Sequence, residues 1–167
     1  MKKKLSNKLT LFYTPNFPKT FKKSSRKNHT VTIGIGGNIG NMKKTFDKLL
    51  LCLKQDSRFT ILKTSPLLKN PPFGFLEQND FLNGIITFKT NLCPNALLKA
   101  MQRYENKFGR KRSFQDAPRT LDIDIIFFDN KKINTKNLII PHKDWANRES
   151  VIIPLNYTRL KKWKKKL

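Results

Sequence analysis

The sequence predicts an α+β fold of the ferredoxin-like βαββαβ class, a two-layer sandwich in which a mostly antiparallel sheet carries helices on one face and is joined by long loops. Two observations support this prediction. Segments typical of strands alternate with segments of helical apolar spacing, in the order strand, helix, strand, strand, helix, strand. The chain has 167 residues, which is enough for one domain whose core needs no disulfides.

The first half of this pattern contains a strand, a helix and two more strands. Residues 30–36 alternate with β-branched side chains and predict a strand, which Gly36-Gly37-Asn38 ends. Residues 41–54 have apolar side chains at helical spacing, namely Met42, Phe46, Leu49, Leu50 and Leu53. Strands are predicted over 58–68 and 81–90, because the two prolines between them cannot continue a sheet.

The second half begins with another helix. Pro94 suits the first turn of a helix, whose apolar stripe reaches about residue 108, and Gly109 ends it. A basic loop then precedes a fourth strand over 120–128. Ile133 and residues 138–140 predict a further short strand, and residues 147–154 predict a final helical turn or two.

The net charge of +24 is concentrated at the two ends of the chain. Residues 1–28 carry nine positive charges and no acid, and residues 159–167 carry six more. Because neither end shows a hydrophobic period, we predict that both are mostly disordered tails around a domain over 29–158. For the N-terminal segment three interpretations stay open: a solvated or wrongly assigned start, an arm for nucleic acid or another acidic partner, and a targeting segment.

A basic chain of this topology is also typical of an RNA-binding domain, which we keep as the alternative function. Such domains read RNA with aromatic side chains beside Lys or Arg on the central strands. Here the third strand has no Lys or Arg over 81–88, and the fourth carries Asp122 and Asp124. Carboxylates on that face would repel phosphates, so nucleic acid is a disfavoured partner.

Asp122 and Asp124 are the first candidates for chemistry. Their side chains point to the same face of a strand, with Cα atoms about 6.6–7 Å apart, and such a pair can hold one or two divalent cations. A bare Asp-x-Asp more often faces solvent, but here a loop rich in basic residues comes before it: Arg110, Lys111, Arg112 and Arg119. Carboxylates, cations and guanidiniums together favour phosphoryl transfer. There is no Gly-x-x-x-x-Gly-Lys phosphate loop in the sequence.

Several ordered motifs resemble the 6-hydroxymethyl-7,8-dihydropterin pyrophosphokinase family of folate biosynthesis. They are Ile33-Gly34-Ile35-Gly36-Gly37-Asn38-Ile39-Gly40, Asn70-Pro71-Pro72-Phe73-Gly74, Phe81-Leu82-Asn83, Pro118-Arg119-Thr120-Leu121-Asp122-Ile123-Asp124, Pro141-His142 and Asn147-Arg148. The resemblance extends from about residue 30 to 155. It implies transfer of the terminal pyrophosphoryl group of the co-substrate ATP to the hydroxymethyl oxygen of a reduced pterin, which leaves AMP.

The resemblance also implies roles for particular residues. Asp122 and Asp124 would hold two Mg²⁺ ions, and a further role of Asp124 as acceptor of the hydroxyl proton stays open. Arg110 and Arg119 would act on the polyphosphate in the transition state. The residues expected at the nucleotide are Gln102, Glu105, Arg112, His142 and Arg148. The residues expected at the pterin are Asn70, Pro71, Pro72, Phe73, Phe81 and Asn83.

The sequence departs from this family at the aromatic side chains. The family has an aromatic residue two positions after the counterpart of Arg148, where this chain has Ser150. Three explanations stay open: Phe81 stacks on the pterin alone, Trp145 takes the place of the missing aromatic side chain, or the affinity for the pterin is lower. The tryptophan often found in the basic loop is absent, with Phe114 or Asp116 nearest, and two nucleotide contacts would fall on Asn137 and Ile139.

We therefore predict a cytoplasmic, monomeric enzyme with no membrane association. No apolar run approaches the roughly 20 residues of a membrane span. Cys52 and Cys93 are too few for a disulfide framework and are expected to be packed thiols. A catalytically weakened relative kept as a nucleotide-binding partner is a further alternative.

Overall fold

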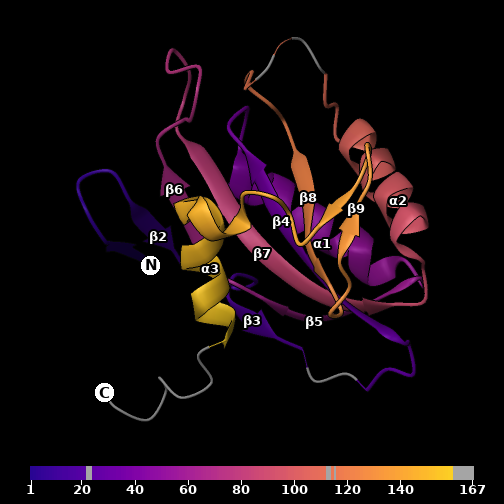
Figure 1. Ribbon diagram of the computed structural model, residues 1–167. Coiled ribbons are helices and arrows are strands. Elements are labelled where there is room, and N and C mark those ends of the chain that lie inside the picture. The colour runs from indigo at the N-terminus through magenta and orange to yellow at the C-terminus, as the bar shows by residue number, and fades with distance from the viewer. Residues whose placement is uncertain (22–23, 112–113, 115, 160–167) are drawn as a thin grey trace.

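The computed structural model describes residues 1–21, 24–111, 114 and 116–159. Its central elements follow the predicted order (Figure 1): β4 (His29–Gly37), α1 (Met42–Gln55), β5 (Phe59–Thr64), β6 (Leu67–Asn70), β7 (Phe81–Thr90), α2 (Pro94–Lys107) and β8 (Asp122–Phe128). The predicted second strand is divided into β5 and β6, because Ser65 and Pro66 interrupt it. The prediction of an α+β fold built on an antiparallel sheet is confirmed.

The sheet is organised around β4, which pairs with β7 on one side and β8 on the other. β7 in turn pairs with β5 over one half of its length and with β6 over the other. All of these pairs are antiparallel. The register sets Gly36 opposite both Asn83 and Asp122, and Gly34 opposite Asp124.

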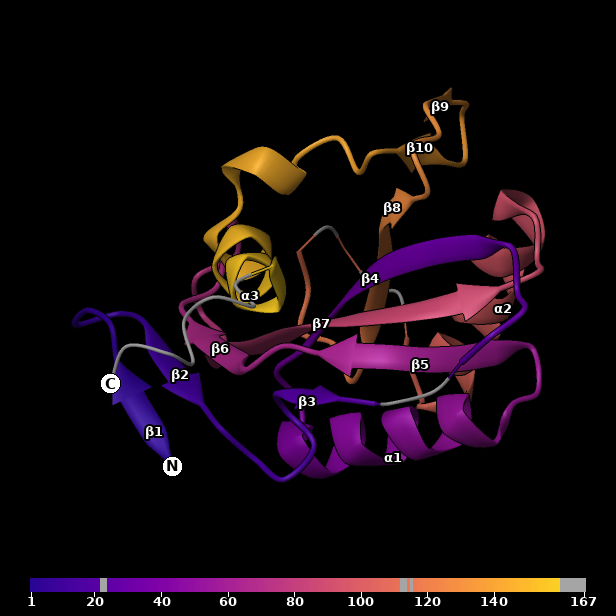
Figure 2. The ribbon, with the colours of Figure 1, turned by 90° about the horizontal axis from the view of Figure 1, so that it is seen from below.

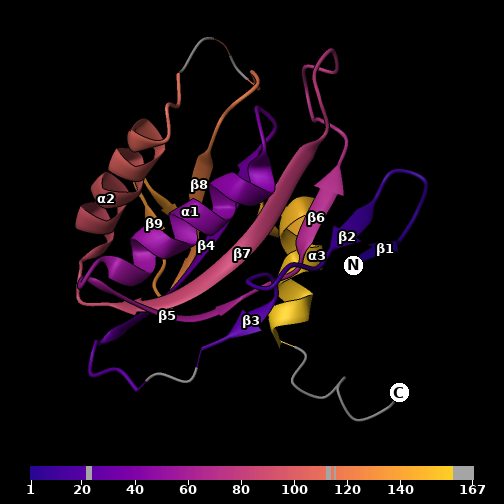
Figure 3. The same cartoon turned by 180° about the vertical axis from the view of Figure 1, so that it is seen from behind.

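One face of the sheet packs against α1 and α2, which lie on the viewer's side in Figure 3. The buried residues of α1 are the five predicted from helical spacing, and Asn41 caps this helix by accepting a hydrogen bond from the Lys44 amide. On α2, Leu97, Ala100, Met101 and Tyr104 are buried. Val31, Ile33 and Ile35 of β4 complete this main core.

The other face is covered in part by α3 (Glu149–Arg159), which lies above the sheet in Figure 2 while α1 lies below it. Val151 and Leu155 of α3 bury Ile85 and Ile126 of the sheet in a second apolar cluster. The expectation of helices on one face is therefore correct for α1 and α2 and wrong for α3. Pro154 within this helix and its irregular apolar spacing explain why the sequence predicts no more than a helical turn or two over 147–154.

The N-terminal segment, predicted to be a disordered tail, forms three short strands in its described part. β1 (Lys2–Lys4) and β2 (Thr10–Phe12) form a hairpin that extends the sheet beyond β6, and β3 (Lys19–Thr20) pairs with β5. Leu11 and Phe17 are completely buried. The prediction of a disordered tail from the charge is wrong for this segment, because the lysines of these strands are exposed and isolated apolar residues reach the core. Of the C-terminal tail predicted over 159–167, residues 160–167 lie outside the described residues.

Between β8 and α3 the chain forms β9 (Ile133–Asn134), β10 (Ile139–Ile140) and a 3-10 helix (Trp145–Asn147). β9 and β10 pair with one another as a small separate sheet, which agrees with the predicted short strand. None of the helices in the described part of the chain is long and apolar enough to cross a membrane.

Asp56 ties the end of α1 to α2 and to the start of β5. Its carboxylate accepts hydrogen bonds from the Arg58 guanidinium at 2.6 Å and from the Tyr104 hydroxyl at 2.8 Å. The hydrogen bond from Arg58, assisted by that from Tyr104, lowers the pKa of Asp56 to about 2. The ionised form is therefore stabilised in the folded state.

We predict that Asp56→Asn lowers the free energy of unfolding by about 1–2 kcal/mol near neutral pH. Because folding lowers this pKa, the stabilisation is complete above pH 4 and is lost as the pH falls toward 2. Urea unfolding of both proteins at several pH values measures the difference. An unchanged difference between pH 5 and pH 2 would contradict the assignment.

Leu11→Ala tests whether the N-terminal hairpin belongs to the fold. Truncating a completely buried leucine is expected to cost about 2–5 kcal/mol. The matched control is Leu5→Ala in the same hairpin, where the side chain is exposed. Equal midpoints of thermal unfolding for the two variants would show that the hairpin does not contribute to the stability of the domain.

Candidate functional site

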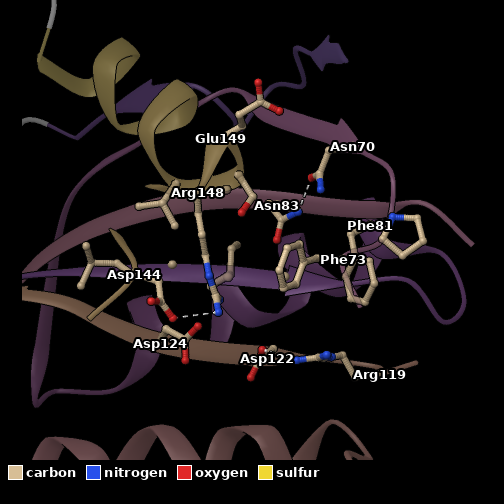
Figure 4. A pocket seen from close by; sticks show the side chains of 18 of the residues that line it. Asn70, Phe73, Phe81, Asn83, Arg119, Asp122, Asp124, Asp144, Arg148 and Glu149 are labelled. Atoms are coloured by element: carbon tan, nitrogen blue, oxygen red, sulfur yellow. Dashed lines mark hydrogen bonds and ion pairs between the residues drawn. The ribbon is translucent and has the colours of Figure 1, made fainter. Parts of the chain in front are cut away.

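A pocket of about 690 Å³ lies on the face of the sheet opposite α1 and α2 (Figure 4). Its floor comes from β4, β7 and β8, and its walls come from the segment after β6, the segment before β8 and the start of α3. The predicted site residues among those that line it are Asn70, Pro71, Pro72, Phe73, Phe81, Asn83, Arg119, Asp122, Asp124 and Arg148. The structure therefore brings most of the predicted site together from distant parts of the chain.

The two aspartates share the pocket face of β8, as predicted from strand alternation. Their partners across the strand pair are Gly36 and Gly34, which have no side chains to fill the space above β4. A Cβ added at Gly36 would lie 2.5 Å from Asn83 Oδ1. Glycine at this position thus leaves room for the amide of Asn83 in the pocket.

Two arginines bracket the carboxylate of Asp122. Arg110 Nη1 lies 2.7 Å from Oδ1, and Arg119 Nη1 lies 2.8 Å from Oδ2. Arg119 also donates from Nε to the Ala117 carbonyl at 3.1 Å, which fixes the plane of its guanidinium. The arginines and the aspartate are each only about one fifth exposed, so these contacts are weakly screened by water.

Glu105 supports Arg110 from below. It is buried on α2, contacts Arg110 Nη1 and accepts a hydrogen bond from the Ile123 amide at 2.7 Å. Burial raises its pKa to about 7, against the opposing effects of the Ile123 amide and Arg110. These contacts make Glu105 a support for Arg110 and for β8. Neither Glu105 nor the exposed Gln102 is among the described residues that line the pocket.

Asp124 faces a second basic group. His142 Nε2 lies 3.9 Å from Asp124 Oδ2. Burial, followed by the neighbouring charge of Asp122, raises the pKa of Asp124, while His142 and Arg148 act in the opposite direction. Arg148 is held by Asp144, whose Oδ2 lies 3.3 Å from Arg148 Nη2 (Figure 4). A cation that bound Asp124 would favour its ionised form.

The opposite half of the pocket is neutral and aromatic. Asn83 donates from Nδ2 to Asn70 Oδ1 at 2.7 Å, which orients its amide and leaves Oδ1 as an acceptor toward the pocket. Phe81 and Phe73 lie beside this amide (Figure 4). The guanidinium carbon of Arg119 lies 5.3 Å from the centre of the Phe81 ring, so the aromatic half directly adjoins the charged half.

The structure also bears on the residues that depart from the family pattern. Ser150 and Asp116 line the pocket. Trp145 instead packs edge to face on Phe127, with ring centres 4.9 Å apart, and is not among the described lining residues. Phe114 packs on Phe75 with ring centres 5.3 Å apart. Arg112 lies outside the described residues.

Sequence reasoning missed Asp144, Glu149, Asn38 and Gln78. Asp144 and Glu149 line the pocket beside Arg148. The spacing of Asp144 four residues before Arg148 is the signal that could have identified it as a partner of this arginine. Asn38 was noted only as part of a glycine turn, and no local pattern distinguishes Gln78 from a solvated loop residue.

Comparison with known proteins places this chain in a family. Residues 32–159 match the family model described as 7,8-dihydro-6-hydroxymethylpterin-pyrophosphokinase. The chain is 50% identical over 123 residues to a protein of Campylobacter jejuni, covering 74% of this chain and 78% of that protein. It is 40% identical over 141 residues to a protein of Helicobacter pylori, covering 83% and 86% of the two chains. Both are named 2-amino-4-hydroxy-6-hydroxymethyldihydropteridine pyrophosphokinase.

We predict that Gly36→Ala displaces the Asn83 amide, because the added Cβ would lie 2.5 Å from its oxygen. Loss of the Asn83–Asn70 hydrogen bond is expected to cost about 1 kcal/mol. Nuclear magnetic resonance of the side-chain amides would show a shift of the Asn83 signal. Gly34→Ala is the matched control, since its added Cβ meets the side chains of Ile126 at 3.4 Å and Ile85 at 4.0 Å, which are ordinary contact distances. An unmoved Asn83 signal in Gly36→Ala would contradict the steric argument.

Proposed function

The chain belongs to the 7,8-dihydro-6-hydroxymethylpterin-pyrophosphokinase family, and we propose that it transfers pyrophosphate from ATP to the hydroxymethyl group of 6-hydroxymethyl-7,8-dihydropterin in folate biosynthesis. AMP is the second product. The names of the relatives support this activity. Within the pocket, one observation carries the proposal: Arg119 contacts both Asp122 and the ring of Phe81.

That contact joins two halves suited to different substrates. The neutral half offers the ring of Phe81, the apolar side chain of Phe73 and the amide of Asn83, which match the flat faces and the hydrogen-bonding edge of a pterin. The charged half offers the guanidiniums of Arg119 and Arg148, and behind Asp122 that of Arg110. Guanidiniums bind phosphate oxygens in a two-pronged fashion. The hydroxymethyl group of a pterin on Phe81 would therefore lie next to the phosphates of ATP.

The reaction needs alignment and charge neutralisation. The hydroxymethyl oxygen attacks the β-phosphorus and gives up its proton to the Asp124 carboxylate or to a water molecule. The bond from that phosphorus to the bridging oxygen of the α-phosphate breaks, and AMP leaves with the electron pair. Arg110 and Arg119 would balance the negative charge that spreads over the phosphate oxygens. Holding the two substrates in adjoining halves of one pocket supplies the alignment.

The donor set of the pocket fits Mg²⁺ that arrives with ATP. Mg²⁺ is usually held by one or two carboxylates together with substrate phosphates and water, and Asp122 and Asp124 lie on one face of β8. The carboxylate of Asp122 would become available to the metal as Arg110 and Arg119 exchange their contacts with it for the phosphates. In the described part of the chain no group of three or more acidic, histidine or cysteine side chains could hold a metal ion without such help. Two bound Mg²⁺ ions would neutralise the phosphates and orient the attacking oxygen.

The remaining predicted contacts are part of the same proposal. His142 is near enough to Asp124 to reach a phosphate in the charged half. Glu105 would serve the nucleotide through Arg110, and Gln102 would have to reach it from the exposed side of α2. We also infer that the sheet order β8-β4-β7-β5 with α1 and α2 on one face represents the ferredoxin-like plan.

The test of this function is incubation of the protein with ATP, Mg²⁺ and the reduced pterin, followed by chromatography of the nucleotides. We expect AMP that depends on the pterin. Asp124→Asn is expected to lower kcat by about 100-fold or more, because one oxygen ligand for the cation is replaced by an amide. The matched control is Asp80→Asn, an exposed aspartate paired with Lys69.

Formation of ADP instead of AMP would contradict the reaction, and near-normal turnover by Asp124→Asn would contradict the role of that carboxylate. The RNA-binding alternative makes the opposite prediction of tight, salt-sensitive RNA binding. The carboxylates of Asp122 and Asp124 on the pocket face of the sheet disfavour it.

A further inference from the structure

Three segments that are distant in the sequence meet at the end of the pocket near Arg119. They are the turn after β4, the segment between β6 and β7, and the segment before β8. Loops of this kind are usually held weakly, because few backbone groups pair between them. Here two side-chain amides, those of Asn38 and Gln78, connect all three segments.

Both ends of the Gln78 amide form hydrogen bonds. Its Nε2 donates to the Phe75 carbonyl at 2.6 Å and to the Asp116 carbonyl at 2.8 Å, and its Oε1 accepts from Asn38 Nδ2 at 2.9 Å. Both carbonyls can only accept, so the nitrogen of Gln78 must face them. The amide thus joins the segment that carries Phe73 to the segment that carries Arg119.

Asn38 links the Gln78 side chain to the backbone of Arg119 by hydrogen bonds. It is 6% exposed, and its Oδ1 accepts a hydrogen bond from the Arg119 amide at 2.9 Å. The backbone N–H of Asn38 donates in return to the Arg119 carbonyl at 3.0 Å. Arg119 is therefore fixed on both sides of its Cα, and its guanidinium reaches Asp122 and Phe81 from that fixed point.

The two segments joined by Gln78 also fit closely against each other. Gly74 has a φ of +77°, and a Cβ added there would collide with the Asp116 carboxylate. Asp116 itself has a φ of +59°, an uncommon backbone conformation for a residue other than glycine. Such a conformation persists only where surrounding contacts hold it, and the hydrogen bond from Gln78 to the Asp116 carbonyl is such a contact.

We propose that Gln78 is a positioning residue that holds Arg119 next to the wall of the pocket on which the pterin would bind. Its hydrogen bonds would thus fix the position of the charged half of the pocket relative to the neutral half. This inference rests on the proposed function for its kinetic consequence, although the placement of Arg119 can be tested without it. Gln78 lines neither half of the pocket among the described residues and acts only through its neighbours.

The kinetic test compares Gln78→Glu and Gln78→Ala with the unaltered protein. Gln78→Glu keeps the length and an acceptor for Asn38 but loses both donors, so a carboxylate would face two carbonyls. We expect kcat to fall about 10- to 100-fold in either variant, because a small misplacement of a reacting group has such effects. Glu77→Gln, at the adjacent exposed position, is the control.

A double-mutant cycle separates positioning from general destabilisation. In an Arg119→Lys background, Gln78→Ala is expected to lower kcat by less than about 3-fold, because the group that it positions is already altered. Multiplication of the two effects would overturn the proposal. Unchanged kcat in both Gln78 variants, in a preparation whose unaltered protein forms AMP, would overturn it as well.

Hydrogen exchange tests the placement without any activity. In Gln78→Ala the Arg119 amide is expected to exchange about 10-fold faster, while amides of β4 and β7 keep their protection. If the unaltered chain forms no AMP, the proposed function fails, and this measurement alone decides the role of Gln78. Exchange of the Arg119 amide at the rate of the unaltered protein would then overturn the inference.

Discussion

The pairing of β4 with β7 and β8 is the constraint on which the rest of the structure depends. Its register sets Gly36 between Asn83 and Asp122, so one short segment of backbone fixes the distance between the neutral and charged halves of the pocket. Because neighbouring strands lie about 4.8 Å apart, no loop movement can change that distance. A slip of one residue would turn Asp122 and Asp124 into the core below and would bring Ile123 into the pocket.

The electrostatics of the pocket follow from this frame. Asp122 accepts contacts from Arg110 and Arg119, and Glu105 holds Arg110 from the buried side, so the charges form a chain across α2, β8 and the preceding segment. Breaking one member of a buried chain leaves the next without a partner. The high net charge of the molecule has less to do with this chemistry, since many of its lysines are exposed on the N-terminal strands and on the outer faces of the helices.

Parts of the fold and site could be predicted because they depend on local pattern. Helical spacing gave the buried face of α1 residue by residue, and strand alternation put Asp122 and Asp124 on one face. The N-terminal strands escaped prediction because their pairing with β6 and β5 is a contact at long range, and lysine on an edge strand looks the same in sequence as lysine in a tail. The placement of α3 over the second face could not be predicted for a related reason: its partners, Ile85 of β7 and Ile126 of β8, are distant from it in the sequence.

By itself, the sequence determined the α+β order of elements, the family, and the residue types available for chemistry. Only the tertiary structure decided how these side chains are used. Trp145 packs on Phe127, Glu105 supports Arg110, and Asn38 and Gln78 carry hydrogen bonds among three distant segments. The physical reason is that a side-chain hydrogen bond or ring contact is specified by the position of its partner, and that position is set by the register of strands far apart in the chain.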